Sequence, residues 1–377
     1  MSRRIVLLGA SGHTGQMVAA ELVRRGQRPV LAGRSPERLA TLAEALGGLS
    51  WRQADVTVAS SVQELVRAYD VLISTVGPFA RLGEPVVAAA IDAGATYLDS
   101  SGEPAFIRRV FEDHGPQALA SGVALLPACG YDFVPGALAA AIALEQAKGA
   151  ATRVDVGYFV VAGSEPMRMS NGTRNSGPGF MLGKSFAWRD GGLRAARFAE
   201  RERAFAVDGY ESRAVSVGGS EHLTLPTTFP QLREVNVYLG WFGSLSPALR
   251  AGSAALAPLL ALPGTRAALT RLGEAAAHRT SRGKVAAPKK PSSEVNEPQT
   301  DGASRIVAIA HADDGRQVGR ADLRGIEPYA FTAAFLAWAG VCALDRQVAG
   351  AGALGPLQAF GRAGLQAGCE QAGIRIA

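Results

Sequence analysis

The chain has 377 residues, a formal net charge of +6 at pH 7 and hydrophobic residues at 47% of positions. This length suits two domains with ample core, and the first predicted strand begins so early that we expect no signal peptide before it. No basic run is interleaved with aromatic residues, which favours anionic small molecules over nucleic acid as ligands. Cys129, Cys342 and Cys369 are odd in number and far apart, which fits a reducing cytoplasm better than a disulfide framework or a metal site.

A glycine-rich turn follows the first predicted strand, residues 4–8, and precedes a predicted helix over 16–25. Gly9 permits a tight turn, Gly12 lets the backbone approach a pyrophosphate, and Gly15 lets helix and strand pack closely. The N-terminus of the helix would supply free N–H groups to the phosphates. The turn therefore predicts a dinucleotide site made of Gly9, Ser11, Gly12, His13, Thr14 and Gly15. We expect His13 to pack or hydrogen-bond beside the pyrophosphate.

The end of the second predicted strand, residues 29–34, indicates which dinucleotide binds. An NAD site usually places an acidic residue about 20 residues after the glycines, where it accepts from the ribose 2′-hydroxyl. Arg34 stands at that place, and a guanidinium there would pair with a 2′-phosphate, so we predict NADP(H). The alternative is that Arg34 is a solvated loop cation. Asp55, at the end of the third predicted strand over 53–56, suits either a contact to the adenine amine or a cap for the next helix.

Strands and helices alternate through the first 145 residues, which predicts a parallel, doubly wound Rossmann sheet. The further elements of this part are strands over 69–76, 96–99 and 123–128 and a helix over 83–93. After about residue 148 the pattern changes to strands without intervening helices. These strands are expected over 153–162, 204–217, 233–240, 305–311 and 317–323. The fold class is therefore α/β, with a second α+β domain built on a mixed or antiparallel sheet.

Two apolar stretches approach the length of a membrane span. Residues 328–344 carry no charge, but a proline, a glycine and polar side chains interrupt them, so we predict a buried core helix and no transmembrane span. Residues 244–263 contain Arg250 and three prolines. They predict a hydrophobic surface or lid helix that serves a lipid-like substrate or a subunit contact. Residues 278–304 are rich in Pro, Ser and Lys, as is typical of a mobile connection.

Three segments at the carboxyl ends of the predicted parallel strands form a second group of site residues, because ligands of open α/β sheets bind in the crevice there. The first contains Thr75, Val76, Gly77 and Pro78, the second runs from Tyr97 to Glu103, and the third begins at Gly130. Each segment alone is compatible with ordinary turn chemistry. Together they predict the nicotinamide side of the site.

Tyr131 and Asp132 are the first candidates for catalysis, because they should enter the crevice near the cofactor, where they would orient an acceptor or relay a proton. Tyr97 and Glu103 are the next candidates. The alternative is that Asp132 caps the helix predicted over 136–147 while Tyr131 packs under the nicotinamide. No metal is expected, because the remaining histidines lack a ligand-like spacing.

Five motifs carry a family resemblance. They are Gly9 to Gly15, Val76-Gly77-Pro78-Phe79, Gly83-Glu84-Pro85-Val86-Val87, Ala93 to Asp99 with Gly102-Glu103, and Gly130 to Pro135. Together they resemble the saccharopine dehydrogenase-like oxidoreductases, most closely the branch that includes trans-acting enoyl reductases of polyketide lipid pathways. The resemblance implies an NADP-binding Rossmann domain, an inserted mixed sheet for substrate, and a C-terminal helix that returns to the first domain. The middle of this chain is shorter than the pattern of that branch.

These observations predict an NADP-binding domain over 1–148, a substrate domain over 149–325 and C-terminal helices over 326–377 that pack back on the Rossmann domain. The expected function is NADPH-dependent reduction of a C=C bond in a hydrophobic enoyl thioester. The alternatives are an imine reductase that forms a secondary amine and a non-catalytic NADPH-binding protein. A saccharopine-type substrate would demand a cluster of arginines. The expected substrate loop offers Arg168 and Arg174 beside apolar residues, which favours an apolar substrate.

A basic group near residue 290 suggests a partner. Its members are Arg279, Arg282, Lys284, Lys289 and Lys290. They could attract a coenzyme A phosphate or an acidic acyl carrier protein, or they could form a solvated loop. We further expect a small-molecule or carrier-bound acyl substrate, a homodimer and a cytoplasmic location.

Overall fold

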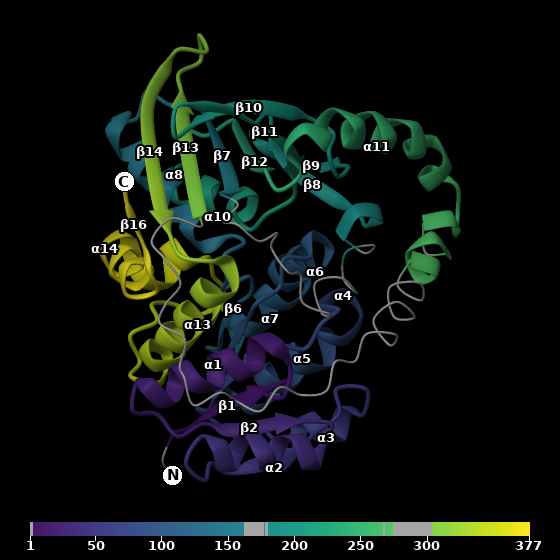
Figure 1. The fold of residues 1–377 in the computed structure, drawn as a ribbon, viewed down its shortest axis with the longest axis vertical. Helices are drawn as coiled ribbons and strands as arrows, with labels where there is room; N and C mark the ends of the chain where they lie inside the picture. The colour runs from purple at the N-terminus through teal and green to yellow at the C-terminus, as the bar shows by residue number, and fades with distance from the viewer. Residues whose placement is uncertain (1–2, 162–176, 178–179, 267, 274–303) are drawn as a thin grey trace.

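Two β-sheets form the framework of the molecule, and helices surround them (Figure 1). The structure is a computed structural model that describes residues 3–161, 177, 180–266, 268–273 and 304–377. The predicted substrate-loop residues Arg168 and Arg174 lie outside this part of the chain, as does the basic group from Arg279 to Lys290.

The first sheet has seven strands in the order β15-β6-β5-β4-β1-β2-β3, and every neighbouring pair is parallel. Its strands are β1 (Ile5–Leu8), β2 (Val30–Gly33), β3 (Trp51–Gln53), β4 (Val71–Ser74), β5 (Thr96–Asp99), β6 (Ala124–Leu126) and β15 (Gly352–Ala353). The order reverses at β1, which confirms the predicted doubly wound sheet. β3 ends at Gln53, so Asp55 lies in the following loop and not at the strand end where we expected it.

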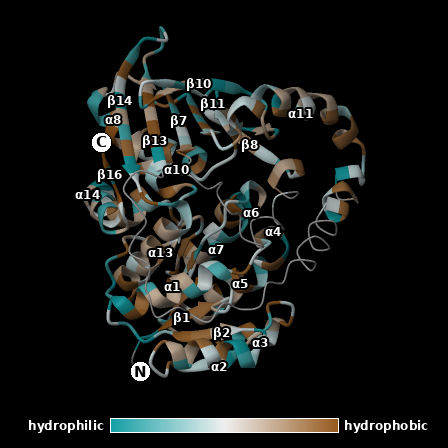
Figure 2. Ribbon diagram, in the orientation of Figure 1, coloured by the Kyte–Doolittle hydropathy of each residue, from teal (hydrophilic) through white to brown (hydrophobic). Residues whose placement is uncertain are grey.

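Both faces of the first sheet are covered, and this explains why β1 is apolar throughout. Ile5 and Leu7 belong to one core cluster together with α1, whereas Val6 and Leu8 belong to a second cluster together with α5. The brown strands in Figure 2 show the same property. The helical segments of this part are α1 (His13–Arg24), α2 (Pro36–Ala45), α3 (Ala59–Gln63), α4 (Phe79–Leu82), α5 (Glu84–Ala93), α6 (Pro104–Arg109), the π-helix Val110–His114 and α7 (Gly115–Ala120).

The second sheet is mixed, because β7 and β12 are parallel while its other neighbouring strands are antiparallel. The order is β10-β11-β12-β7-β13-β14-β16, with β8 paired to β12 and β9. Its strands are β7 (Arg153–Val160), β8 (Ser185–Arg189), β9 (Gly192–Ala196), β10 (Glu202–Val207), β11 (Tyr210–Val217), β12 (Glu234–Leu239), β13 (Ser304–His311), β14 (Gln317–Gly325) and β16 (Ile374–Ile376).

The single strand predicted over 204–217 was wrong, because the chain turns back on itself there. β10 and β11 form a hairpin whose turn residues, Asp208 and Gly209, have φ values of 50° and 83°. Asp190 and Gly191 turn the β8–β9 hairpin in the same way, with φ values of 52° and 70°. Asp-Gly is the dipeptide that two-residue hairpin loops favour, because both positions need a positive φ.

α8 (Val134–Gln146) joins the two sheets through a continuous core. It packs on β7, β13 and β14 of the second sheet, and its residues from Val134 to Leu144 are buried. α13 (Pro328–Leu344) packs on α1, β4 and β5, which confirms the predicted core helix. α14 (Pro356–Gln371) lies on α8 and α13. The division of the chain at residues 148 and 325 stays a prediction.

Among the residues that the structure describes, further helices are α10 (Glu221–Thr228), the 3-10 helix η2 (Gly243–Leu245) and α11 (Ser246–Ala261). α11 lies within the predicted surface helix over 244–263. In the part of the chain that the structure describes, no helix has the length and apolar character needed to cross a membrane.

Candidate functional site

The glycine-rich loop runs from the end of β1 to the start of α1, beside the end of β4. Gly9 has a φ of +87°, and a Cβ there would lie 2.7 Å from the Thr75 hydroxyl. A Cβ on Gly15 would overlap the carbonyl oxygen of Gly9, so α1 packs directly on the loop. Gly12 is exposed, and a Cβ there would meet one atom within 4 Å, the Gly9 carbonyl oxygen at 3.2 Å. The open side of Gly12 therefore leaves room for a phosphate group to approach the backbone.

The first turn of α1 has the character of an anion site. α1 has no side-chain cap and no acidic residue in its first turn. Backbone N–H groups at such a helix end attract phosphate. The Thr75 hydroxyl lies 3.3 Å from the carbonyl oxygens of both Leu8 and Gly9, so it ties the end of β4 to the loop. The His13 ring packs edge-on against Tyr329, with 5.1 Å between centroids, and thereby places the start of α13 beside the loop.

Arg34 lies exposed at the end of β2, as the prediction of a 2′-phosphate contact requires. Hydrogen bonds from Thr57, and to a smaller degree the charge of Arg34, lower the pKa of Asp55. The Asp55 carboxylate accepts from the Thr57 N–H and hydroxyl at 2.9 and 2.8 Å. α3 has Val58 as its N-cap residue without a side-chain cap, so the alternative that Asp55 caps this helix was wrong.

Arg38 is a second cation at this end of the site that the sequence prediction missed. Its guanidinium donates to the carbonyl oxygen of Ser11 in the glycine-rich loop. It lies in the first turn of α2, four residues after Arg34. Arg38 follows closely after β2, and β2 ends at the predicted ribose position. This closeness to Arg34 in the sequence could have identified Arg38.

The loop expected beside the nicotinamide, Val76 to Pro78, lies between β4 and α4. Glu103 accepts from the backbone N–H groups of Phe79 and Ala80 at 2.7 and 2.9 Å. Its carboxylate therefore holds the first turn of α4 in place. This bonding indicates a structural role for a residue that was a secondary catalytic candidate.

Tyr131 links the two sheets. Its backbone N–H donates to the Thr332 hydroxyl at 3.0 Å, and its side-chain hydroxyl donates to the carbonyl oxygen of Phe159 at 3.1 Å. Its ring packs edge-on against Tyr158 and Phe331. Gly130 is buried against Thr332, where a Cβ would lie 3.1 Å from the threonine methyl group. The hydroxyl of Tyr131 is thus already hydrogen-bonded to β7 of the second sheet.

Asp132 follows Tyr131 and lies beside Gly102, where a Cβ would come within 3.5 Å of its Oδ2. The residue is partly exposed, but its Oδ1 is shielded from solvent and has no hydrogen-bond partner among the described residues. α8 has Phe133 as its N-cap residue without a side-chain cap, so the alternative that Asp132 caps this helix was wrong. Burial raises the pKa of Asp132 to about 7. At neutral pH its carboxyl group can therefore both give and take a proton.

A fully buried carboxyl group, which the sequence prediction missed, is close enough to Asp132 to interact with it electrostatically. Glu221, at the start of α10, is fully buried and accepts from the Tyr158 hydroxyl at 2.6 Å. Its Oε2 has no hydrogen-bond partner in the described part of the chain. Burial, with a further contribution from Asp132, raises the pKa of Glu221 to about 8. No local sequence pattern marks this residue, because the burial that makes it unusual comes from β8, β12, α8 and α14, which pack on α10.

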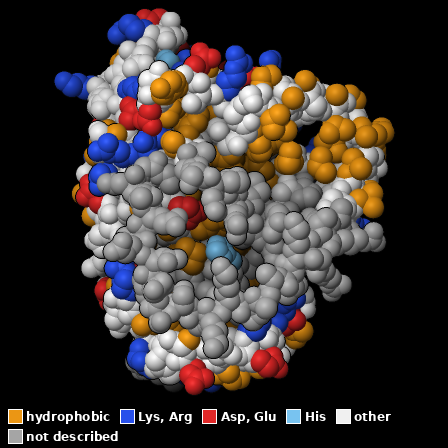
Figure 3. All heavy atoms as spheres, viewed as in Figure 1, with side chains coloured by type: hydrophobic (Ala, Val, Ile, Leu, Met, Phe, Trp, Pro, Cys, Tyr) orange, Lys and Arg blue, Asp and Glu red, His pale blue; other side chains and the backbone are white. Residues whose placement is uncertain are grey.

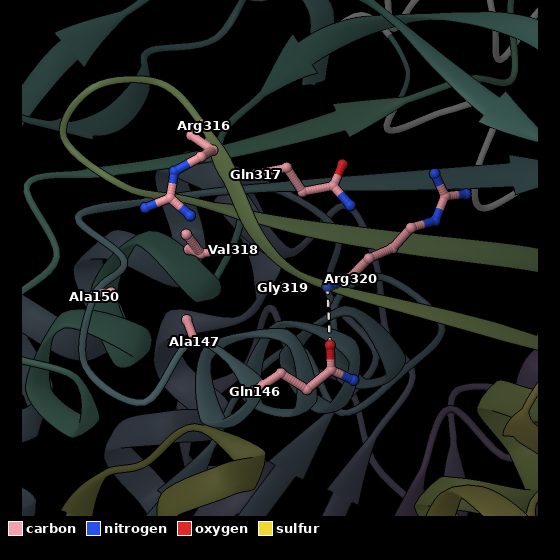
Figure 4. Close-up of a pocket in the computed structure, with 8 residues that line it drawn as sticks. All are labelled: Gln146, Ala147, Ala150, Arg316, Gln317, Val318, Gly319 and Arg320. Atoms are coloured by element: carbon pink, nitrogen blue, oxygen red, sulfur yellow. Dashed lines mark hydrogen bonds between the residues drawn. The ribbon is translucent and has the colours of Figure 1, made fainter.

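A cavity of about 610 Å³ lies elsewhere, at the end of α8 and beside β14 (Figure 4). Two of its cations already have partners. Arg320 makes two 2.7 Å bonds to the Asp322 carboxylate, and Arg316 lies 3.7 Å from Asp314. No residue of the glycine-rich loop lines this cavity, so we do not assign it to the site.

Comparison with known proteins assigns the N-terminal part of the chain. Residues 5–125 match the family described as saccharopine dehydrogenase NADP binding domain. This match confirms the resemblance that the motifs suggested, and it confirms NADP(H) as the cofactor of this domain.

Two relatives match parts of the chain. A trans-acting enoyl reductase of Mycobacterium ulcerans is 38% identical over 140 residues, which cover 36% of this chain and 34% of the relative. A saccharopine dehydrogenase-like oxidoreductase of Bos taurus is 30% identical over 190 residues, which cover 46% of this chain and 44% of the relative. The chain thus spans about a third to under half of the length of these relatives.

The fold as a whole is similar to that of a solved structure, apo saccharopine dehydrogenase (L-Glu forming) from Saccharomyces cerevisiae. The TM-score is 0.59 with 13% sequence identity, and the match covers 100% of this chain and 99% of the other. At this identity the likeness confirms the fold class, a parallel Rossmann sheet joined to a domain with a mixed sheet.

Proposed function

We propose that the chain is an NADPH-dependent reductase that acts on the C=C bond of a hydrophobic enoyl thioester. When bound, NADPH would supply the hydride for this reaction. The residues of the chain would hold the cofactor, orient the acceptor and provide a proton. The NADP-binding family match supports the cofactor, and the enoyl reductase name of the Mycobacterium ulcerans relative supports the acceptor.

The cofactor-binding residues divide into three groups. The N–H groups of the loop and of the first turn of α1 would bind the pyrophosphate. Arg34 would pair with the 2′-phosphate, assisted by Arg38, while Asp55 would accept from the adenine amine. The third group would lie along the nicotinamide and consists of Thr75, Val76, Gly77, Pro78 and Gly130.

The observation that carries the proposal is the carboxyl group of Asp132. When a hydride adds to the β-carbon of an enoyl thioester, the α-carbon must receive a proton. Burial raises the pKa of Asp132 to about 7, and the residue follows β6 in the loop before α8, where its partial exposure would let it regain a proton from water. We assign the proton transfer to Asp132. Tyr131, whose hydroxyl is bonded to Phe159, would position this segment.

Apolar side chains of the second domain favour a hydrophobic substrate. Phe180, Phe198 and Phe242 pack edge-on, with centroids 5.5 and 5.9 Å apart. They come from segments before β8, before β10 and after β12. A substrate with several carboxylates would need fixed arginines instead.

The test is NADPH oxidation with two matched substrate panels, one of enoyl thioesters of increasing chain length and one of amine-plus-carbonyl pairs. We expect oxidation with the thioesters alone, and lower turnover in Asp132→Asn with unchanged NADPH affinity. Asp92→Asn, an exposed carboxyl change on α5, is the control. Oxidation with amine-plus-carbonyl pairs alone would overturn the proposal in favour of imine reduction. NADPH binding without turnover in either panel would indicate a non-catalytic binding protein.

A further inference from the structure

α11 exposes an apolar surface that the proposed reductase activity does not use. Leu245, Leu256, Leu259 and Leu262 are exposed by 63%, 42%, 44% and 56%. We call these four side chains the α11 face. Figure 3 shows hydrophobic side chains gathered over this helix, at the upper right of the molecule. Figure 2 shows the same helix as brown and pale along most of its length.

The exposed side of α11 is apolar, which is unusual for a helix on the surface of a protein. Its inward side is mixed: Leu249 packs against the core and Ser246 is buried, while Ser253 accepts from Arg197 at 2.9 Å and donates to the carbonyl oxygen of Phe198. Leu256 and Leu259 are exposed on the helix, and Leu245 and Leu262 are exposed directly before and after it. A helix on the surface of a globular protein normally places its apolar stripe inward and its polar residues outward. The α11 face is therefore suited to an apolar partner.

The segment that contains α11 carries only positive charge, whereas Asp208 and Glu211 of the β10–β11 hairpin line a pocket together with Pro247 of α11. The sequence has no acidic residue from Val235 to Gly273, whereas it has arginines at 250, 266 and 271. Arg250 and Arg271 are exposed. Arg266 donates to the carbonyl oxygens of Leu182 and Gly183. An apolar face flanked by arginines complements the acyl boundary and the phosphates of an anionic lipid surface. A second copy of the chain would instead bring like charges together.

The length of α11 agrees with a position in the plane of a membrane surface. The helix has 16 residues, fewer than the roughly 20 that a spanning helix needs. We propose that α11 attaches the protein to the surface of an anionic phospholipid bilayer. In this arrangement the α11 face enters the boundary between headgroups and acyl chains, and Arg250 and Arg271 lie at the lipid phosphates.

The test is co-sedimentation of the full chain with vesicles of phosphatidylcholine, with and without phosphatidylglycerol. We expect binding that strengthens with phosphatidylglycerol and weakens with added salt. The double variant Leu256→Glu/Leu259→Glu should bind the vesicles on the order of tenfold or more weakly, because two charges would replace inserted leucines. Val58→Glu changes an apolar side chain that is 51% exposed on another part of the molecule, and it should bind like the wild type.

Three results would overturn the proposal. They are absence of binding to either vesicle, equal binding by the double variant, and a wild-type dimer that the double variant dissociates without any vesicle binding. The last result would mean that a second copy covers the α11 face. NADPH affinity, measured in parallel, should be the same in all variants, so this test is independent of the proposed reductase activity.

Discussion

The glycine-rich loop follows β1, and the segment around Asp132 follows β6 of the same sheet. The two regions nevertheless provide opposite electrostatic environments. The loop is open, with an exposed Gly12 and the cations Arg34 and Arg38 nearby. Around Asp132 and Glu221 carboxyl oxygens are shielded from solvent, and burial raises both pKa values toward or above neutrality. One region is suited to holding an anion, and the other to keeping carboxyl groups protonated. Substitutions should therefore separate cofactor binding from proton transfer.

The largest effect is expected at Gly12. Gly12→Val should reduce NADPH binding below detection, because the new side chain would occupy the space that the pyrophosphate needs. The fold should remain, since the φ of −78° suits any residue and the surrounding space is open. Gly15→Val is the contrasting variant, because its Cβ would overlap the Gly9 carbonyl oxygen and lower the melting temperature. Calorimetric titration and thermal melts measure both effects. Retained NADPH affinity in Gly12→Val would mean that the phosphates lie elsewhere.

Asp132→Asn should have the next largest effect, on kcat. We expect a loss on the order of a hundredfold with unchanged NADPH affinity, because an amide cannot supply the proton. Wild-type activity should fall as the pH rises above about 7, where Asp132 loses its proton, and this fall should be absent in the variant. Tyr131→Phe should have a smaller effect, since the hydroxyl is bonded to Phe159. Unchanged turnover in Asp132→Asn would assign the proton to another group or to solvent.

Arg34→Ala should weaken NADPH binding by about 1.5–3 kcal/mol, the usual contribution of a hydrogen bond to a charged group. NADH affinity should hardly change, because NADH lacks the 2′-phosphate. Arg324→Ala, which removes an exposed arginine from the second sheet, is the control. Fluorescence titration with both cofactors measures the difference. Equal wild-type affinities for NADPH and NADH would contradict the proposed role of Arg34.

The smallest effect concerns stability and Glu221. Its pKa is about 8 in the folded chain and about 4.3 in an unfolded one, so between these values the folded state binds more protons. The free energy of unfolding should therefore fall as the pH rises from about 5 to about 8. Glu221→Gln keeps an oxygen that accepts from the Tyr158 hydroxyl. The variant should reduce the loss of unfolding free energy over this pH range by about 1.4 kcal/mol or more, the equivalent of one pKa unit. Glu44→Gln, on exposed α2, should leave the slope unchanged. Denaturant titrations at several pH values decide between these outcomes.

Short-range patterns predicted most of the fold and failed where a turn was overlooked. The apolar strands and the helices between them predicted the parallel sheet, because each element depends on neighbouring residues. The Asp190-Gly191 and Asp208-Gly209 turns were visible in the sequence, and attention to them would have predicted both hairpins. β15 and β16 have two and three residues and could not be predicted, since they exist only by pairing with β6 and β14.

By itself the sequence determined the form of the glycine-rich loop, because β1, the turn and α1 are consecutive in the chain, and the roles of its glycines and of Arg34 toward the cofactor stay predictions. Only the tertiary structure decided the pKa values of the carboxyl groups of Asp132 and Glu221. Tyr131 meets Thr332 across 201 residues, and Tyr158 meets Glu221 across 63. The pKa of a carboxyl group depends on how much water the packing of distant segments removes from it. No local pattern records that packing, so Asp132 appeared in the sequence only as a candidate and Glu221 did not appear at all.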